Sequence, residues 1–172
     1  MRLRVIGGTA REDSLVTTPL CSACPHSPAG CCAAPPRVAL ADLARIVRHG
    51  GRDFLLAELA AGRLVAGPGN AWLNYPRRPH ASGVLACGYL GEAGCVLPPE
   101  RRSTTCNTYV CDEALARAPR EDDPDAVRAT RDALEADLAA WDAALAERVP
   151  LGGPIDGAWL DAVASAFAAL RP

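Results

Sequence analysis

The 172-residue sequence contains no lysine, and all 18 of its basic residues are arginine. A lysine-containing phosphate loop and Schiff-base chemistry both need a lysine amine, so the sequence excludes these two mechanisms. The sequence also has no apolar run close to the roughly 20 residues of a membrane-spanning helix. Its net charge is only −2, and we therefore expect neither a nucleic acid nor an anionic membrane as a partner.

The N-terminus lacks the apolar core of a signal peptide, because charged residues interrupt it from Arg2 to Asp13. We therefore expect a cytoplasmic protein, in which thiols are kept reduced. Cysteine makes up eight of 172 residues, about 5%, which is below the ~8–10% of disulfide scaffolds. A disulfide framework remains an alternative, since the number of cysteines is even.

The rest of the composition is that of a globular protein, with 49% hydrophobic and 22% charged residues. A chain of this length can bury a sizeable core, and we expect a single domain over residues 1–172. The pattern predicts a short strand over residues 2–6 and helices over residues 38–49 and 52–61. Residues 65–81 are rich in Gly and Pro and are predicted to form a loop.

A helical extension is predicted after the last cysteine, over residues 123–171. Asp123 followed by Pro124 is a typical helix start, because the carboxylate caps backbone N–H groups and proline has none to lose. Apolar residues then recur at helical spacing as far as Leu145. Asp156 is expected to cap a second helix. These two C-terminal helices complete the prediction of a mostly α-helical fold.

The strongest functional signal is a set of eight cysteines in two groups, within a predicted metal-binding region over residues 15–112. The first group lies in CSACPHSPAGCC, residues 21–32, and the second group spans residues 87–111. We expect two irregular cysteine-rich loops that converge on one metal site. The candidate ligands are Cys21, Cys24, Cys31, Cys32, Cys87, Cys95, Cys106 and Cys111.

The spacing and the chemistry of these cysteines limit which metals they can bind. Cys21 and Cys24 have the C-x2-C spacing, which lets two thiolates bind one ion around a tight turn. The adjacent Cys31 and Cys32 suit two metal centres, a bridging thiolate or a cluster. Thiolates are soft ligands that favour zinc, copper(I) or iron–sulfur clusters. The irregular spacing slightly favours an iron–sulfur cluster over Zn2+, and both stay open. Some of these cysteines can instead be small buried apolar residues.

The pattern CSACPHSPAGCC, followed by ACGYLGEAGCVLPPERRSTTCNTYVC, resembles the bacterial CxxCxxCC or YkgJ-type cysteine-cluster family. That family is described as a zinc- or iron-chelating domain with eight characteristic cysteines, and it includes the flagellin lysine-N-methylase. The resemblance implies that the eight cysteines fill its two motifs. Two departures are present: PHSPAG lengthens the first motif, and Ser103 follows Arg102 where the family has proline.

Other polar residues lie near the cysteines. His26 lies inside the first group and is an alternative ligand, and His80 is an alternative ligand or base. For both histidines an exposed loop position is the simpler interpretation. Four arginines flank the second group and can offset thiolate charge, bind an anionic partner or simply be solvated. They are Arg77, Arg78, Arg101 and Arg102.

Three functional hypotheses follow from these patterns. The first is a metal- or cluster-binding protein that acts in metal handling, in electron transfer or as an accessory to an enzyme. The second, suggested by the methylase, is a metal-dependent protein-modifying enzyme, although no glycine-rich nucleotide loop and no clear base are visible. The third is a structural zinc module that binds a protein partner. The sequence favours the first hypothesis, in which the protein is not an enzyme, and leaves the others open.

Overall fold

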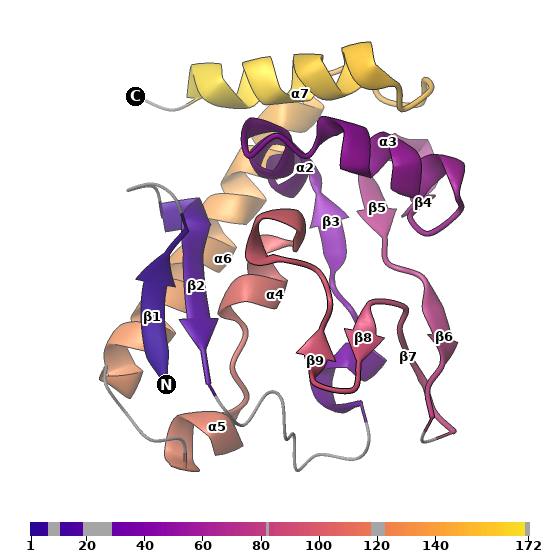
Figure 1. Ribbon diagram of the computed structural model, residues 1–172. Coiled ribbons are helices and arrows are strands. Elements are labelled where there is room, and N and C mark those ends of the chain that lie inside the picture. The colour runs from indigo at the N-terminus through magenta and orange to yellow at the C-terminus, as the bar shows by residue number, and fades with distance from the viewer. Residues whose placement is uncertain (7–10, 19–28, 82, 118–122, 171–172) are drawn as a thin grey trace.

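The computed structural model describes residues 1–6, 11–18, 29–81, 83–117 and 123–170 (Figure 1). Over these residues the chain passes from an N-terminal hairpin through helices and short strands into two longer C-terminal helices. More residues lie in helices than in strands, as the sequence predicts. The described strands form four small sheets, which the sequence analysis did not predict beyond the first strand.

The N-terminal hairpin joins β1 (Arg2–Val5) to β2 (Ser14–Thr17) in antiparallel register, with Leu3 opposite Val16. The strand predicted over residues 2–6 is confirmed by β1. A short 3-10 helix, η1 (Arg11–Asp13), immediately precedes β2. The hairpin packs through β2 against α4 (Thr104–Thr108). Its apolar side contributes to a small cluster that contains Met1, Val110, Ala114, Leu115 and Val127.

The two helices predicted next are confirmed as α2 (Leu40–Arg48) and α3 (Arg52–Ala60). The first begins later than predicted, because residues 37–39 form strand β3 (Arg37–Ala39). Asp42 accepts a hydrogen bond from the backbone N–H of Ala39 at 3.2 Å and so caps α2. Between the helices Gly50 has a φ of 74°, a conformation that glycine adopts without strain.

Short strands replace the loop predicted over residues 65–81 and part of the second cysteine loop. In one sheet β5 (Trp72–Asn74) lies between β3 and β4 (Val65–Ala66) and pairs with both. Two further hairpins follow, the first from β6 and β7 and the second from β8 and β9. Strands of two or three residues are too short to show an alternating pattern, which is why the sequence did not indicate them. They are β4 (Val65–Ala66), β5 (Trp72–Asn74), β6 (Arg77–Pro79), β7 (Leu85–Cys87), β8 (Leu90–Gly91) and β9 (Gly94–Cys95).

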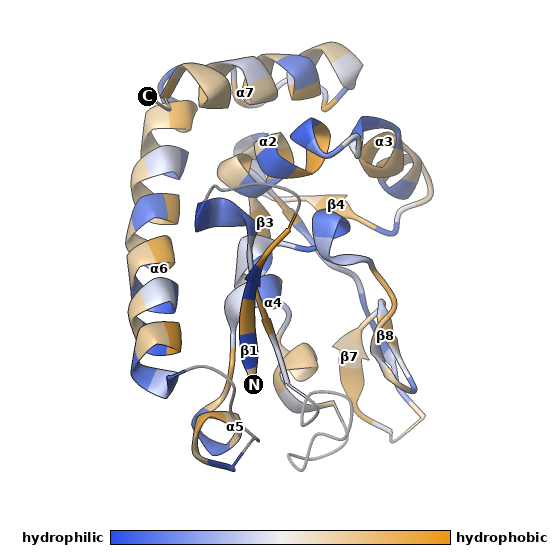
Figure 2. Ribbon diagram, turned by 60° about the vertical axis from the view of Figure 1, so that its left-hand side comes forward, coloured by the Kyte–Doolittle hydropathy of each residue, from blue (hydrophilic) through white to orange (hydrophobic). Residues whose placement is uncertain are grey.

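The two predicted C-terminal helices are confirmed as α6 (Pro124–Ala146) and α7 (Gly157–Leu170), and a short α5 (Asp112–Arg117) precedes them. Asp123 caps α6 by accepting from the N–H of Asp125 at 3.0 Å. Figure 2 shows α6 along one side of the molecule and α7 across its end, above α2. Trp141 on α6 meets Phe167 on α7 edge to face, with ring centroids 5.4 Å apart.

The main apolar core lies where α2, α3, α6 and α7 meet the sheet that contains β5. Its fully buried members include Leu43, Ile46, Leu55, Leu73 and Leu160. This core holds the helices together and leaves the cysteine-bearing segments on one side of them (Figure 1). Within the described chain, no helix combines the length and the apolar character needed to cross a membrane.

Candidate metal centre

Six of the eight candidate ligands lie in the described residues, and each of the six is a free thiol. Cys21, Cys24 and the alternative ligand His26 lie outside the described residues. The six described cysteines come from five different segments of the chain. Cys31 and Cys32 are in η2 (Gly30–Ala33), Cys87 ends β7, Cys95 ends β9, Cys106 is in α4, and Cys111 immediately precedes α5.

The fold brings the described part of the first group beside the second group. The η2 segment lies against β7, which carries Cys87. The thiol of Cys32 interacts electrostatically with those of Cys87 and Cys106. Cys106 in turn interacts with Cys95 and Cys87. Cys111 is different, since its side chain packs against the small apolar cluster beside the N-terminal hairpin.

The adjacent thiols of Cys31 and Cys32 share a hydrogen bond, which gives them different acidities. This bond lowers the pKa of Cys31 to about 6 and raises the pKa of Cys32. Burial and the charge of neighbouring thiols raise the pKa of Cys32 further. The pair therefore holds one proton near neutral pH, and a metal ion that binds both sulfurs must displace that proton.

Two thiols of the second group, Cys87 and Cys106, have raised pKa values that favour their neutral form. Burial raises the pKa of Cys87, and the neighbouring Cys95 adds to the effect. The surrounding protein atoms raise the pKa of Cys106 to about 12, although part of its side chain reaches solvent. Each thiolate would be disfavoured by the others. A soft cation would supply the positive charge that such a set lacks, and thiolates are the type of donor that zinc and iron prefer.

The described thiols alone do not form a complete ligand shell. Within the described ranges, no three or more His, Cys, Asp or Glu side chains are arranged as a group that could hold a metal ion. The C-x2-C pair formed by Cys21 and Cys24, which the sequence assigns to the same site, is not among these residues. The eight-cysteine site therefore stays a prediction.

Two of the four flanking arginines support the backbone around the second group. Arg102 donates from Nε to the carbonyl of Leu97 at 2.8 Å and from Nη2 to the carbonyl of Cys95 at 3.4 Å. Arg101 donates from Nη1 to the carbonyl of His49 at 3.0 Å. Arg102 thus fixes the turn that follows β9, whereas Arg101 ties the chain before α4 to the turn between α2 and α3.

The other two arginines and the second alternative histidine lie around the hairpin formed by β6 and β7. Arg77 and Arg78 are exposed on β6. His80 lies at the turn, where its backbone N–H donates to the carbonyl of Val84 at 2.8 Å. A role of His80 as a ligand or a base stays a prediction.

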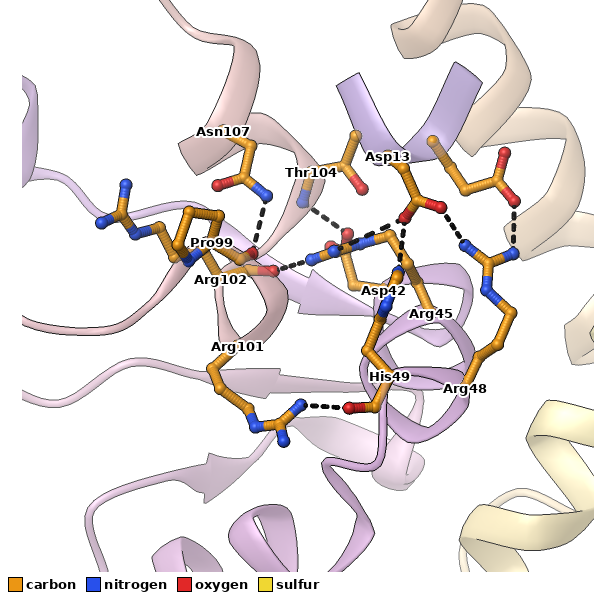
Figure 3. Close-up of polar contacts among 11 residues, drawn as sticks. Asp13, Asp42, Arg45, Arg48, His49, Pro99, Arg101, Arg102, Thr104 and Asn107 are labelled. Atoms are coloured by element: carbon orange, nitrogen blue, oxygen red, sulfur yellow. Dashed lines mark hydrogen bonds and ion pairs between the residues drawn. The ribbon is translucent and has the colours of Figure 1, made fainter. Parts of the chain in front are cut away.

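Sequence reasoning missed a buried charge network beside α4 (Figure 3). At its centre Asp13 accepts from Nη2 of Arg48 at 2.6 Å and lies 2.8 Å from Nε2 of His49. The fully buried Arg45 lies 3.9 Å from the same carboxylate. The only signal in the sequence is a three-residue spacing on α2, which is equally typical of an exposed ion pair. The network consists of Glu12, Asp13, Asp42, Arg45, Arg48 and His49.

Comparisons with protein-family models, with curated proteins and with solved structures found no match to this chain. The resemblance to the YkgJ-type family therefore remains a prediction that depends on the cysteine pattern alone.

Proposed function

We propose that this protein binds a zinc ion or an iron–sulfur cluster through its cysteines. In this proposal it acts in metal handling or electron transfer, or as an accessory to an enzyme. The observation that carries the proposal is electrostatic interaction among the thiols of Cys32, Cys87, Cys95 and Cys106, which come from four separate segments but do not by themselves form a metal-holding group within the described residues. Chance burial of small apolar residues does not require four thiols to approach one another.

The proposed ligand set contains all eight cysteines, and their contributions differ. Cys31 and Cys32 bring the first group to the site, together with the C-x2-C pair formed by Cys21 and Cys24. Cys87, Cys95 and Cys106 bring the second group. Cys111 has the weakest support, because its side chain packs in an apolar cluster. Eight ionised thiolates would leave a single divalent ion with excess negative charge, so the proposal includes either two centres or one cluster.

The free state of the described thiols favours reduced cysteines, which can bind a metal, over a disulfide framework. All six are unpaired, including two that are adjacent in sequence and share a hydrogen bond. Reduced thiols that persist at a partly exposed site need a reducing compartment or a bound metal. We therefore propose a cytoplasmic location together with metal binding.

Purification without oxygen, followed by elemental analysis and absorption spectroscopy, tests this function. A brown protein that contains iron and absorbs near ~400 nm identifies an iron–sulfur cluster. A colourless protein with stoichiometric zinc identifies a zinc site. Metal-free protein whose cysteines resist thiol reagents until they are reduced contradicts the proposal, because it indicates disulfides.

A further inference from the structure

The helix that carries Cys106 is anchored at its first turn by residues outside both cysteine groups. Ser103 is the N-cap of α4, and its Oγ accepts from the backbone N–H of Cys106 at 3.2 Å. Ser103 and Thr104 are almost fully buried. A helix of five residues has little stability of its own, so its position depends on whatever holds this turn.

Two backbone N–H groups of the turn bind buried side chains from elsewhere. The N–H of Ser103 donates to Oη of Tyr75 at 2.8 Å. The N–H of Thr104 donates to Oδ1 of Asp42 at 2.7 Å, and Oδ2 of Asp42 accepts from Ala39 at 3.2 Å. One carboxylate thus joins the start of α2 to the start of α4 (Figure 3).

Arg45 supplies a third anchor and the balancing charge. Its Nη2 donates to the carbonyl of Arg102, the residue directly before the cap of α4. The Arg45 side chain is fully buried, and the carboxylates that face it are Asp42 and Asp13. Figure 3 shows Arg45 between the Asp13 side and the Arg102 side of the network. Positive charge also comes from the neighbouring Arg48.

Packing alone does not explain a charged pair at this place. Burial raises the pKa of Asp42 and lowers the pKa of Arg45, which shows that the fold disfavours both charges. Apolar residues of similar volume often give equal or greater stability than a buried ion pair. What the pair provides, and apolar side chains cannot, is a fixed set of hydrogen bonds to the backbone of residues 102–104.

The anchored turn lies next to the thiols. The surrounding protein atoms and the charges of Cys95 and Cys87 raise the pKa of Cys106, and the Asp42 carboxylate adds to this effect. Tyr75, the second anchor, is also within electrostatic reach of Cys106. A shift of this turn would therefore move the Cys106 sulfur relative to the other thiols.

We propose that Asp42, with Arg45 as its buried counterion, is a positioning residue that fixes the first turn of α4 and so sets the place of the Cys106 thiol in the cysteine site. The consequence for metal affinity rests on the proposed function. The positioning of α4 itself does not, and it can be measured in metal-free protein.

Two variants remove the link between Asp42 and α4 in different ways. Asp42→Asn removes the negative charge of the carboxylate and leaves one acceptor oxygen in place of two. Thr104→Pro keeps Asp42, deletes the N–H that it binds together with the Thr104 hydroxyl, and puts the proline Cδ in the place of the hydrogen, where it displaces the Asp42 carboxylate. The backbone itself suits proline there, because Thr104 is the first helical residue and Ser103 has φ −64° and ψ 155°, values that suit the residue before proline. Asp142→Asn is the matched control, since Asp142 also caps α2, through the N–H of Ala41 at 2.9 Å.

Two readouts separate this inference from the proposed function. The first is Co2+ binding, followed by the thiolate-to-cobalt absorption band. We expect about 10–100-fold weaker binding and an altered band in Asp42→Asn and Thr104→Pro, as for other residues that orient metal ligands. The second is amide hydrogen exchange over residues 104–109 of the metal-free protein. There we expect about tenfold faster exchange, the effect of losing a charged hydrogen bond. The control is expected to match the wild type in Co2+ binding and to show no faster exchange than the wild type over these residues.

The results test the proposed metal binding and the positioning of α4 separately. Wild-type protein that binds no Co2+ defeats the proposed function, and the exchange rates then decide the positioning alone. Unchanged exchange in both variants overturns the positioning of α4. Faster exchange with unchanged Co2+ affinity and spectrum overturns the role of Asp42 in the cysteine site. Weaker binding in the two variants and not in the control supports the inference.

Discussion

Oδ1 of Asp142 on α6 accepts a hydrogen bond from the backbone N–H of Ala41 on α2 at 2.9 Å. Ala41 lies in the first turn of α2, where backbone N–H groups have no acceptor within their own helix. The carboxylate therefore caps one helix from the side of another. Asp42, which caps the same turn, lies close enough to raise the pKa of Asp142 in addition to the effect of burial.

Asp142 should make stability depend on pH in the acidic range. Burial raises its pKa from 3.8 to about 6, so the folded chain keeps a proton that the unfolded chain releases. The free energy of unfolding should then fall as the pH rises from about 4 to about 6, and level off above this range. Asp142→Asn keeps a carbonyl acceptor and should gain about 1–2 kcal/mol at pH 8 after allowance for solvent screening. Urea unfolding at several pH values checks this, and an unchanged pH slope in the variant would contradict it.

Asp13 should be the residue that attaches the N-terminal hairpin to α2. Its substitution by Asn weakens the contacts to Arg48 and His49 and leaves the buried Arg45 with less opposing charge. Breaking a buried ion pair from one side costs about 3–5 kcal/mol, and we expect a loss of this size in urea unfolding.

The matched control for Asp13 is the exposed pair between Arg11 and Asp137, at 2.8 Å, in which the side chains are 54% and 34% exposed. Arg11→Gln should cost less than about 1 kcal/mol, because solvent screens this pair. Equal losses for the two variants would show that the buried network does not hold the hairpin.

The hydroxyl of Tyr89 should contribute to stability through Glu58. Tyr89 is buried two residues after Cys87, and its hydroxyl donates to Oε2 of Glu58. Tyr89→Phe should lower the free energy of unfolding by about 1–2 kcal/mol, the typical effect of losing a hydrogen bond to a charged group. Tyr109→Phe is the control, since Tyr109 is 44% exposed, and thermal unfolding should not distinguish it from the wild type. A similar loss in both variants would refute a specific role for the Tyr89 hydroxyl.

Gly51 should be intolerant of any side chain. A Cβ atom at this position would lie 2.4 Å from Cγ2 of Ile46 and 2.7 Å from the Ile46 carbonyl oxygen, between α2 and α3. Gly51→Ala should cost about 1–3 kcal/mol through overpacking, measured by urea unfolding. Gly153→Ala meets nothing within 4 Å and should be neutral. If the two substitutions have the same effect, the close approach at Gly51 is not a constraint.

The helices could be predicted because their signals are local. Asp123 and Asp156 cap α6 and α7 as expected, and Gly50 separates α2 from α3. The strands could not be predicted, because each one depends on a partner rather than on its own pattern. β3, for example, is a strand because Val38 pairs with Leu73, far along the chain. The sequence of its three residues is equally compatible with the start of a helix.

For the candidate site, too, one part could be predicted from the sequence and another part could not. Thiol chemistry follows from residue type, so a soft metal could be inferred from the cysteines alone. Which thiols become neighbours depends on the hairpin of β6 and β7, which sets Cys87 against η2. The anchoring of α4 by Asp42 and Arg45 could not be predicted from the sequence. Two opposite charges three residues apart on a helix normally indicate an exposed pair.

The most direct test of the account is the metal content and free-thiol count of anaerobically purified wild type, beside Cys32→Ser and Cys87→Ser. The account predicts stoichiometric zinc or iron in the wild type and its loss in both variants, because the two thiols come from different groups that share one site. Wild-type protein without metal, in which all eight cysteines react as free thiols, would contradict it. So would a metal content that neither substitution changes.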